Sequence, residues 1–536
     1  MEDSPRGPAR RLRARGPAEL RERPVAVESG ELLPGTEEMP ARRPRPQRRR
    51  GRLPIAAWLC FVVALANGIA WGLIVPLFQT PDEPGHIAYV QYVAETGKPP
   101  TGRADFSHFS EQERILLNAL RWKQVQRRQH NRVPGTATYQ KRLERTVDTP
   151  ANRVSGGGYT TATNNPPLYY YAAAAVYRLS PWTALPDRVH LLRLFSALLA
   201  AVTVLFVFLF LRELLSSTPW AWTVGALAVA FQPMFGFTAS GVSSDAVLYA
   251  ACAGIFYMFA RAFRCGLTPR RGTAIVVLAA IGLLAKTTML GLAPGIAFGL
   301  LALVLSAQGA RRHQAIRGAL AALGVVAAPL AIYMVLNSMV WDRSLWFGSS
   351  GVPALSAIVG GTGSGGLLDF ASYTWQFYLP RLPFMDSYFA HYPLRSVWFD
   401  GFIGEFGWLD YGFPRWVYNW SLALAFVLLA LVARQLISLR EVLRSRLWEL
   451  ATYVLLALGL LVLIAGAGYV AQLDDAKGYE QPRYLFPLLA LYGAVIALAA
   501  RGAGKRYGLA LGIFLVFIAI AHTAAAMLLT LTRYYG

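Results

Sequence analysis

The chain has 536 residues, of which 55% are hydrophobic and only 15% are charged, and its formal net charge is +22. Ordinary soluble domains carry about 25% charged residues, so this composition excludes an ordinary soluble globular protein and indicates an integral membrane protein. The three cysteines, Cys60, Cys252 and Cys265, are too few for a disulfide framework, and their spacing matches no metal site.

The first 53 residues carry 14 arginines and 8 acidic residues, are broken up by Pro and Gly, and show no apolar periodicity. Such a segment cannot bury enough apolar surface to offset the entropy of ordering. We therefore predict that residues 1–53 form a disordered, basic cytoplasmic tail. The tail is too long for a secretory signal peptide, and binding of anionic lipid by this basic arm remains an open alternative.

Eleven stretches are apolar and long enough to cross a bilayer, for which a helix needs about 20 residues. They are 54–78, 188–211, 219–239, 243–263, 273–290, 292–308, 317–340, 416–433, 448–470, 483–500 and 507–531. We therefore expect an all-α polytopic membrane protein with one transmembrane domain over residues 54–531.

Lysine and arginine gather in every second connection between these stretches. The basic connections lie near residues 212, 261–271, 311–317, 434–446 and 501–506. Because basic residues mark cytoplasmic loops, this pattern places the N-terminus in the cytoplasm and residues 532–536 at an outer-face C-terminal end. The net charge is then mostly a topology signal and not a sign of nucleic-acid binding. The loops 79–187, 341–415 and 471–482 fall on the outer face, where we expect any chemistry.

The first outer loop begins with the segment Pro81-Asp82-Glu83-Pro84-Gly85-His86. Two adjacent carboxylates at a membrane boundary are costly to desolvate and repel each other unless water, a cation or a proton intervenes. The prolines restrict the direction in which the carboxylates point. Helix capping by Thr80 or Asp82 is the alternative, but capping explains one acid and neither the pair nor His86.

Two other parts of this loop predict helices. Ser110 and Glu113 have the spacing of a capping box that opens an amphipathic helix to about Arg128, near the membrane surface. The loop returns to the membrane at Asn164-Asn165-Pro166-Pro167-Leu168-Tyr169-Tyr170-Tyr171. The prolines begin a helix and an aromatic belt accounts for the tyrosines, which leaves Asn165 as a candidate substrate ligand.

Three more polar residues lie where hydropathy would not place them. Lysine at mid-membrane costs about 2.5–3.5 kcal/mol on insertion scales, so Lys286 should face the protein interior with an anionic partner, unless it snorkels to the outer interface. Arg483 lies at the outer mouth of the tenth span, against the charge trend, which suggests a bound anion. Asp245 lies at the outer entrance of its span, where helix capping explains it as well as function does.

The loop 341–415 has 19 Trp, Tyr and Phe among its 75 residues. Such residues line interfaces and stack on sugars or acyl chains. Charged residues lie between them, including the candidate substrate ligands Arg381 and His391. We expect this loop to form a lid or substrate wall against the membrane.

The acidic pair and the two cationic residues together suggest a reaction. A carboxylate whose pKa is raised by its neighbour could deprotonate an acceptor hydroxyl, while Lys286 and Arg483 stabilise charge on a departing phosphate. The anion expected at bilayer depth is a lipid phosphate, so the chemistry is glycosyl transfer from a polyprenyl-phosphate sugar. The absence of a Gly-rich phosphate loop agrees with a lipid-borne donor.

The chain resembles the GT-C superfamily of integral-membrane glycosyltransferases, which includes protein O-mannosyltransferases and the aminoarabinose transferases of lipid A. It looks closer still to a bacterial membrane family marked by Pro-Asp-Glu-Pro-x-His and by a late Arg-Tyr-Leu-x-Pro run. These motifs are Pro81–His86 and Arg483–Pro487 here. The similarity spans about residues 54 to 500 and includes Asn165–Tyr169, Ser244–Ala246 and Leu284–Thr287.

The resemblance implies an inverting transferase in the bacterial cytoplasmic membrane, with a lipid-linked sugar donor and a glycan, lipid or protein acceptor. It implies Asp82 as the base, Glu83 as its partner, Lys286 and Arg483 as donor-phosphate ligands, and Asp245 as a further substrate ligand. His86 and Tyr484, which belong to the two motifs, are also candidate substrate ligands. Many GT-C enzymes carry a soluble C-terminal domain that this sequence does not show, so we expect the outer loops to recognise the acceptor. A divalent metal at the acidic pair is an open alternative with an incomplete ligand set.

Three other functions stay open at this point. A transporter or flippase of lipid-linked saccharides would also place charges in the membrane, but such proteins often show internal repeats, and none is visible here. An O-antigen-ligase-like enzyme with a lipid-pyrophosphate donor would rely on Arg381, His391 and Arg395 in the late loop. A non-catalytic scaffold would leave Lys286 and the acidic pair without a purpose.

Overall fold

A computed structural model gives the structure of the protein and describes residues 53–100, 108–147, 149–154, 156–157, 160–182, 184–341, 367–389, 394–473 and 480–536. The predicted basic tail lies outside these residues, except for Leu53.

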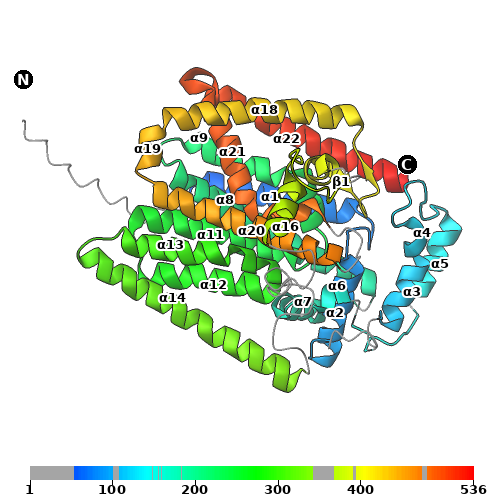
Figure 1. The fold of residues 1–536 in the computed structure, drawn as a ribbon. Helices are drawn as coiled ribbons and strands as arrows, with labels where there is room; N and C mark the ends of the chain where they lie inside the picture. The colour runs from blue at the N-terminus through cyan, green and yellow to red at the C-terminus, as the bar shows by residue number, and fades with distance from the viewer. Residues whose placement is uncertain are drawn as a thin grey trace, which may run out of the picture. The chain divides into compact units, whose positions relative to one another are not determined.

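The described chain is an all-α polytopic membrane protein, which confirms the predicted fold class. Within it, nine helical segments are long and apolar enough to cross a membrane. They are α1 (Ile55–Ile74), α8 (Leu185–Leu214), α11 (Asp245–Cys265), η2 with α13 (Thr287–Leu305), α14 with η3 (Ala310–Val340), α18 (Arg415–Ser438), α20 (Leu447–Leu473), η5 with α21 (Pro482–Gly502) and α22 (Gly504–Tyr535). Most of these helices run from left to right in Figure 1.

Two of the eleven predicted spans differ from expectation. The stretch 219–239 is interrupted, giving α9 (Pro219–Ala230) and α10 (Pro233–Ala239). The interruption has a local cause, because Pro233 has no N–H to donate and the Gln232 side chain instead accepts from the N–H of Phe235.

The stretch 273–290 is also broken, at Lys286. Helix α12 (Pro269–Ala285) ends there, because the Lys286 backbone is extended, with φ −155° and ψ 133°. A 3-10 helix, η2 (Thr287–Leu292), follows and leads into α13 (Ala293–Leu305). The break lies at the residue that carries the intramembrane charge.

Small residues bring the spans into close contact. A Cβ atom on Gly225 of α9 would lie 2.5 Å from the carbonyl oxygen of Gly493 in α21, and one on Gly459 of α20 would lie 2.2 Å from the carbonyl oxygen of Gly291. Any larger residue would push these helices apart. Backbone contact at glycine is typical of helix packing in membranes, where no hydrophobic force drives helices together.

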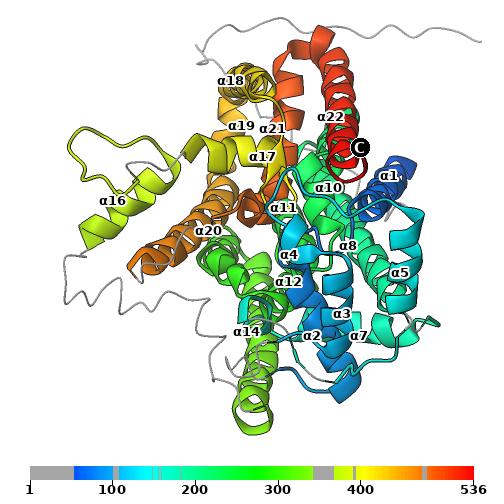
Figure 2. The same cartoon turned by 90° about the vertical axis from the view of Figure 1, so that its right-hand side faces the viewer.

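The described residues of the segment 79–187 form six short helices that gather at one end of the spans. They are α2 (Glu83–Thr96), α3 (Glu111–Ala119), α4 (Trp122–Val125), α5 (Ala137–Val147), α6 (Thr160–Thr163) and α7 (Leu168–Leu179). The C-terminus of α22 lies at the same end (Figures 1 and 2). We call this the α2–α7 end of the molecule.

The predicted capping box begins α3, but the helix is shorter than expected. The Ser110 hydroxyl accepts a hydrogen bond from the Glu113 N–H at 3.1 Å. The helix ends at Ala119 and not near Arg128, because Arg121 has a left-handed backbone with φ 50°. The Glu113 carboxyl is fully buried and has no hydrogen-bond partner among the described residues, and this burial raises its pKa well above the ordinary value.

The late loop contributes α16 (Leu367–Tyr378), η4 (Arg395–Asp400), α17 (Gly401–Gly404) and a two-residue antiparallel pair, β1 (Glu405–Phe406) and β2 (Tyr411–Gly412). Its aromatic side chains largely pack on one another and on α20. The Tyr373 ring lies 5.1 Å from the Tyr469 ring, and the Trp398 indole donates to the Phe377 carbonyl at 2.6 Å. The lid function expected of this loop stays a prediction.

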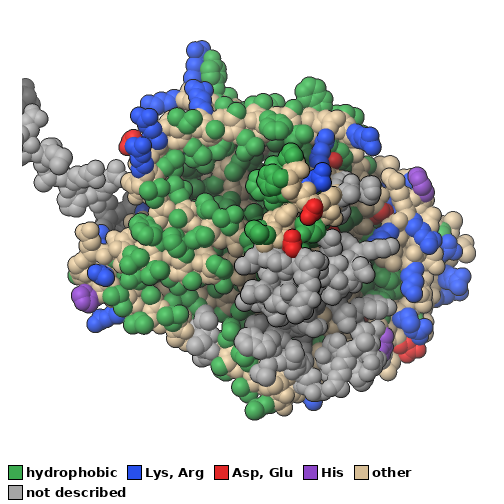
Figure 3. Space-filling model, viewed as in Figure 1, with side chains coloured by type: hydrophobic (Ala, Val, Ile, Leu, Met, Phe, Trp, Pro, Cys, Tyr) green, Lys and Arg blue, Asp and Glu red, His purple; other side chains and the backbone are tan. Residues whose placement is uncertain are grey.

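Charged side chains concentrate at the two ends of the spans. Figure 3 shows hydrophobic side chains over the long helices and Lys and Arg side chains at both the left-hand and right-hand edges. Helix α19 (Arg440–Arg444), which links α18 to α20, lies at the left-hand end (Figure 1). The multi-pass membrane location is thus supported, and the direction in which the chain crosses stays a prediction.

Candidate functional site

The turn between α1 and α2 directs the Asp82 side chain. Helix α1 ends at Ile74, and two non-glycine residues between it and α2, Phe78 at φ 67° and Asp82 at φ 64°, have left-handed backbones. Each such residue costs roughly 1–3 kcal/mol and persists only where contacts with its surroundings hold it in place. Asp82 occupies the N-cap position of α2 and Glu83 lies in its first turn, as the capping alternative expects. The Asp82 side chain makes no capping hydrogen bond, however, and the Thr80 hydroxyl has no hydrogen-bond partner among the described residues.

Glu83 provides one of the contacts that hold this turn. Its carboxylate is fully buried and binds Arg193 of α8 through two hydrogen bonds of 2.6 and 2.8 Å. It also accepts from the backbone N–H groups of Phe78 at 2.9 Å and Val242 at 3.2 Å. Glu83 is therefore saturated by structural partners and does not sit beside the Asp82 carboxylate, contrary to its predicted role as the partner of Asp82.

Arg193 completes this fixed arrangement. Besides Glu83, its guanidinium donates to three carbonyl oxygens at the C-terminal end of α1, those of Gly72, Val75 and Pro76. These carbonyls lack helical partners, and a buried cation there also complements the helix dipole. The pair thus joins α1, the motif turn and α8.

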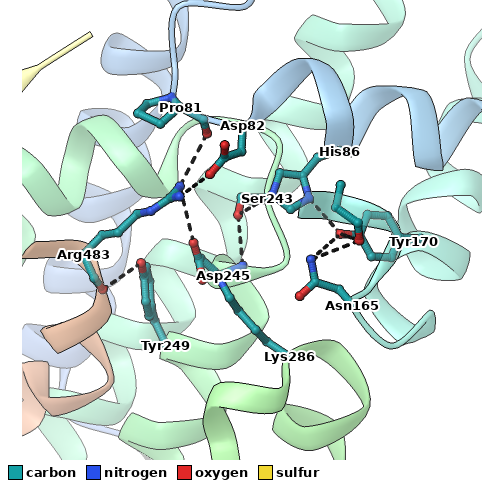
Figure 4. Close-up of polar contacts among 11 residues, drawn as sticks. Pro81, Asp82, His86, Asn165, Tyr170, Ser243, Asp245, Tyr249, Lys286 and Arg483 are labelled. Carbon is teal, nitrogen blue, oxygen red and sulfur yellow. Dashed lines mark hydrogen bonds and ion pairs between the residues drawn. The ribbon is translucent and has the colours of Figure 1, made fainter. Parts of the chain in front are cut away.

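Asp82 points instead into a cluster of four charged side chains (Figure 4). Arg483 of η5 binds the Asp82 carboxylate, and Lys286 at the break after α12 binds Asp245 of α11 at 2.5 Å. The second Asp245 oxygen lies 3.8 Å from Arg483, which links the two pairs. The structure thereby brings together four predicted site residues from four elements of the chain, and Lys286 has the anionic partner that was expected.

The cluster contains two cations and two carboxylates and is mostly shielded from solvent. The exposed fraction of the side chain is 6% for Arg483, 5% for Asp245 and 15% for Lys286, but 28% for Asp82. Desolvating ion pairs is costly, and replacing such pairs by apolar residues is often neutral or stabilising, so packing alone gives no reason to keep this cluster. Asp82 is the member most accessible to a ligand.

The pKa of Asp82 shifts in the direction opposite to the one expected. Burial raises the pKa of this carboxyl, but the charge and hydrogen bond of Arg483 outweigh burial and hold the pKa below its ordinary value. The expectation that a neighbouring carboxylate raises this pKa is wrong, because Glu83 is turned away. Asp82 is therefore ionised at neutral pH.

His86 borders the cluster as a neutral imidazole. Burial lowers its pKa to about 4. Its Nδ1 atom lies 2.7 Å from the Tyr170 hydroxyl, and its Nε2 atom lies 3.4 Å from the Ser243 hydroxyl. Asn165 is buried and donates to the Tyr170 hydroxyl at 3.2 Å, so it orders the histidine through the tyrosine (Figure 4).

Tyr484 lies against both cations. Its ring centroid is 5.8 Å from the Lys286 ammonium and 5.7 Å from the Arg483 guanidinium. Contacts of this kind favour cations over an aromatic face. The neighbouring Tyr249 hydroxyl donates to the Arg483 carbonyl at 3.3 Å and so fixes the backbone of η5.

The predicted late-loop ligands do not join this cluster in the part of the chain that the structure describes. Arg381 is exposed, and its side chain donates to the Met385 carbonyl at 3.4 Å. Arg395 binds Asp400 and Asn419. His391 lies outside the described residues.

The described residues contain no group of three or more His, Cys, Asp and Glu side chains that could hold a metal ion. Asp82 and Asp245 each bind a cationic side chain, and Glu83 is occupied by Arg193. The residues at the cluster therefore do not fit a divalent metal in this arrangement.

A large apolar groove lies between α18, α21 and α22. Its volume is about 1050 Å³, and its wall includes Phe402, Trp416, Trp420, Tyr492, Phe514 and Phe517. Two buried rings, those of Phe486 and Tyr249, link the groove wall to Arg483. The Phe402 ring lies 5.9 Å from that of Phe486, which lies 5.6 Å from that of Tyr249.

Arg193 is not among the site residues expected from the sequence, although the sequence contains a signal for it. Arg193 lies in the run Leu191-Leu192-Arg193-Leu194 inside the predicted span 188–211. The cost of an intramembrane cation, which drew attention to Lys286, applies equally to it. Tyr170 and Ser243 gave no such signal, because polar residues near the membrane interface are ordinary.

Comparisons with known proteins add a family and a distant likeness. The family described as "Predicted membrane protein (DUF2142)" matches residues 65–492, which is most of the chain. Among solved structures, the Archaeoglobus fulgidus oligosaccharyltransferase in the apo form is similar with 13% identity and a TM-score of 0.43, over 89% of this chain and 56% of that one.

The same archaeal enzyme tethered to an acceptor peptide containing the NVT sequon gives 12% identity and a TM-score of 0.38, over 90% of this chain and 55% of that one. The chain thus spans little more than half the length of these structures. No curated protein matches the sequence.

Proposed function

We propose a glycosyltransferase function for this chain, which belongs to the DUF2142 family of predicted membrane proteins. The proposed reaction moves a sugar, with inversion, from a polyprenyl-phosphate donor to a hydroxyl group of a cell-envelope acceptor. The observation that carries the proposal is the cluster of Asp82, Asp245, Lys286 and Arg483 at the α2–α7 end, in a protein that also has a large apolar groove between α18, α21 and α22.

The donor has two chemically different parts, and the site offers a partner for each. Its phosphate would bind Arg483 and Lys286, because guanidinium and ammonium groups form charge-assisted hydrogen bonds with phosphate oxygens. Its polyprenyl chain would lie in the groove between α18, α21 and α22. The rings of Phe486 and Tyr249 link the groove wall at Phe402 to the backbone of Arg483, and one donor would occupy both places.

Asp82 would serve as the general base. It would take the proton of the acceptor hydroxyl as the new bond to the anomeric carbon forms and the bond from that carbon to the phosphate oxygen breaks. The phosphate would leave with the electron pair of that bond, and the two cations would stabilise its charge. Attack from the side opposite the phosphate inverts the configuration at this carbon.

The pairing of Asp82 with Arg483 suggests how the donor would activate the base. In the ligand-free chain the guanidinium lowers the pKa of Asp82 and so weakens it as a base. A donor phosphate would compete with Asp82 for Arg483. Once Arg483 turns to the phosphate, the burial that raises the pKa of Asp82 is less opposed, and Asp82 becomes a stronger base when the donor is present.

An O-antigen-ligase-like reaction receives no comparable support, because Arg381 bonds within the late loop and Arg395 binds Asp400 and Asn419 of α18. No contact among the described residues favours a transporter over the transferase.

The test is to compare envelope glycans and lipid-linked sugars by mass spectrometry in cells with and without the gene. We expect the deleted strain to lose one sugar substituent and to accumulate one polyprenyl-phosphate sugar. The wild-type gene should restore the substituent, and so should Asp386→Asn, which removes an exposed acid outside the cluster. Restoration by Asp82→Asn, expressed at the same level, would remove Asp82 from the mechanism.

A further inference from the structure

A strongly basic surface covers the outermost part of the α2–α7 end. Within residues 108–147 all nine Lys and Arg side chains are exposed, whereas only two of the three acidic side chains are. The nine are Arg114, Arg121, Lys123, Arg127, Arg128, Arg132, Lys141, Arg142 and Arg145. None of them forms an ion pair with another described residue. Figure 3 shows their charge gathered at the edge over α3–α5.

This surface contains a cleft between α3 and α5. The cleft has a volume of about 330 Å³, and its polar lining comes from Asn118, Arg121, Tyr139, Arg142 and Thr146. That volume lies within the roughly 300–1,000 Å³ range of small-ligand sites. The Arg121 guanidinium lies 5.7 Å from the centre of the Tyr139 ring, and the Tyr139 hydroxyl donates to the Ala119 carbonyl, so the cleft has a fixed wall.

The basic surface is fastened to the turn that carries Asp82. Trp122, the residue after Arg121, donates its indole N–H to the Phe78 carbonyl at 3.2 Å. Near the C-terminus of α22, Arg533 donates to the carbonyls of Val125, Arg128 and Asn131 and binds Asp410 at 3.0 Å. A molecule bound along α3–α5 would therefore be held at a fixed position relative to the cluster.

A soluble anion fits this surface better than a membrane does. No large hydrophobic side chain is exposed in the described residues 108–147, and α5 has no buried residue. A helix that lies on a bilayer needs an apolar face to insert among the headgroups, and this surface does not offer one. It also lies beyond the ends of the spans and not beside them (Figures 1 and 2).

We propose that the exposed basic surface of α3, α4 and α5 binds the acceptor of the transfer, and that this acceptor is an anionic glycan with repeating phosphate or carboxylate groups. The role of the bound glycan as an acceptor rests on the proposed function. The binding of an anionic glycan to this surface does not. Several unpaired guanidinium groups in a row recognise a chain of regularly spaced anions, and the cleft would hold one of its units. A hydroxyl further along such a chain would then reach Asp82.

The experiment measures binding without any donor. The probe is a fluorescein-labelled glycerol-phosphate oligomer, added to the purified full chain in a neutral detergent at about 0.15 M salt, where only close contacts between charges persist. The test variant is R121Q/R142Q/R145Q. The matched control is R311Q/R312Q/R317Q, which removes three exposed arginines at the other end of the spans.

We expect the test variant to weaken binding of the probe about tenfold or more, because each lost charge-assisted hydrogen bond matters in a surface site. The control variant should bind as the wild type does, and a labelled neutral dextran should not bind. Equal weakening in both variants, or in neither, would overturn the proposal. So would loss of binding to phosphatidylglycerol vesicles without loss of binding to the probe, because the surface would then contact the membrane.

Failure of the proposed function would look different. Asp82→Asn should bind the probe as the wild type does, whatever its activity. In a transfer assay, the test variant should raise the KM for the anionic acceptor and leave kcat unchanged. If Asp82→Asn still transfers sugar while R121Q/R142Q/R145Q loses the probe, the base assignment fails and the anion site stands.

Discussion

Asp82 and Glu83 are neighbours in the sequence, and each binds an arginine from a distant helix, yet the two ion pairs differ in almost every other respect. Glu83 and Arg193 are fully buried, and backbone groups take up their remaining hydrogen-bonding capacity. Asp82 is partly exposed, and its arginine also faces a second acid that is paired with a lysine. The first pair is closed to ligands, and the second is open.

The difference shows that residue types alone do not indicate whether an ion pair is structural or can bind a ligand. A saturated pair can only hold the surrounding backbone, as Glu83 and Arg193 hold the end of α1 and the motif turn. A pair whose members can exchange partners can bind a charged ligand. The left-handed backbone at Asp82 makes the two acids diverge, so one motif supplies both a support and a candidate site.

The largest effect on activity is expected from a change of Asp82 alone. Asp82→Asn should lower the rate of sugar transfer by about 10²–10⁴-fold, which is the usual contribution of a general base. Its thermal midpoint should stay close to that of the wild type, because Arg483 keeps Asp245 as a partner. A transfer assay with purified protein and a thermal scan in the same detergent measure both. A large loss of stability without a lower rate of sugar transfer would show that Asp82 has a structural role, like Glu83.

The complementary change removes the ion pair between Glu83 and Arg193. Arg193→Met should destabilise the protein by about 3–5 kcal/mol, because it leaves the Glu83 carboxylate buried without a counter-ion. The matched control, Arg415→Met, removes an exposed arginine at the start of α18 and should have little effect. Denaturation in mixed detergent measures the difference. Equal stability of the two variants would show that the Glu83 pair holds nothing.

Lys286 tests whether the open cluster binds the donor. Lys286→Met should raise the KM for the polyprenyl-phosphate donor about tenfold, the effect of losing one charge-assisted hydrogen bond, and should leave the KM for the acceptor nearly unchanged. Steady-state kinetics with each substrate varied in turn separates the two values. An equal rise in both would make the lysine a structural residue.

The smallest expected effect concerns pH. The pKa of His86 is about 4 in the folded chain, below the ordinary 6.5, so the unfolded chain takes up a proton first as the pH falls. This contribution to stability is complete above about pH 6.5 and is lost toward pH 4, at about 1 kcal/mol per pH unit between 6 and 5. His86→Asn should flatten the pH dependence of the thermal midpoint in that range. An unchanged slope would mean that His86 is not buried as a neutral group.

The fold class and several residues of the candidate site can be predicted from the sequence alone. Hydropathy and helix length are local properties, so the spans can be read from composition, and the cost of an intramembrane charge singles out Lys286 without knowledge of its partner. The capping pattern at Ser110 likewise fixed the start of a helix.

The pairing of the charged side chains depends on the tertiary structure. Arg483 binds an acid 401 residues away, and Glu83 binds an arginine 110 residues away, through contacts that exist because helices pack together. Turn geometry separated Asp82 from Glu83, and a proline split the span 219–239. Pairing energies depend on distance and solvent exclusion, and no short stretch of sequence contains either quantity.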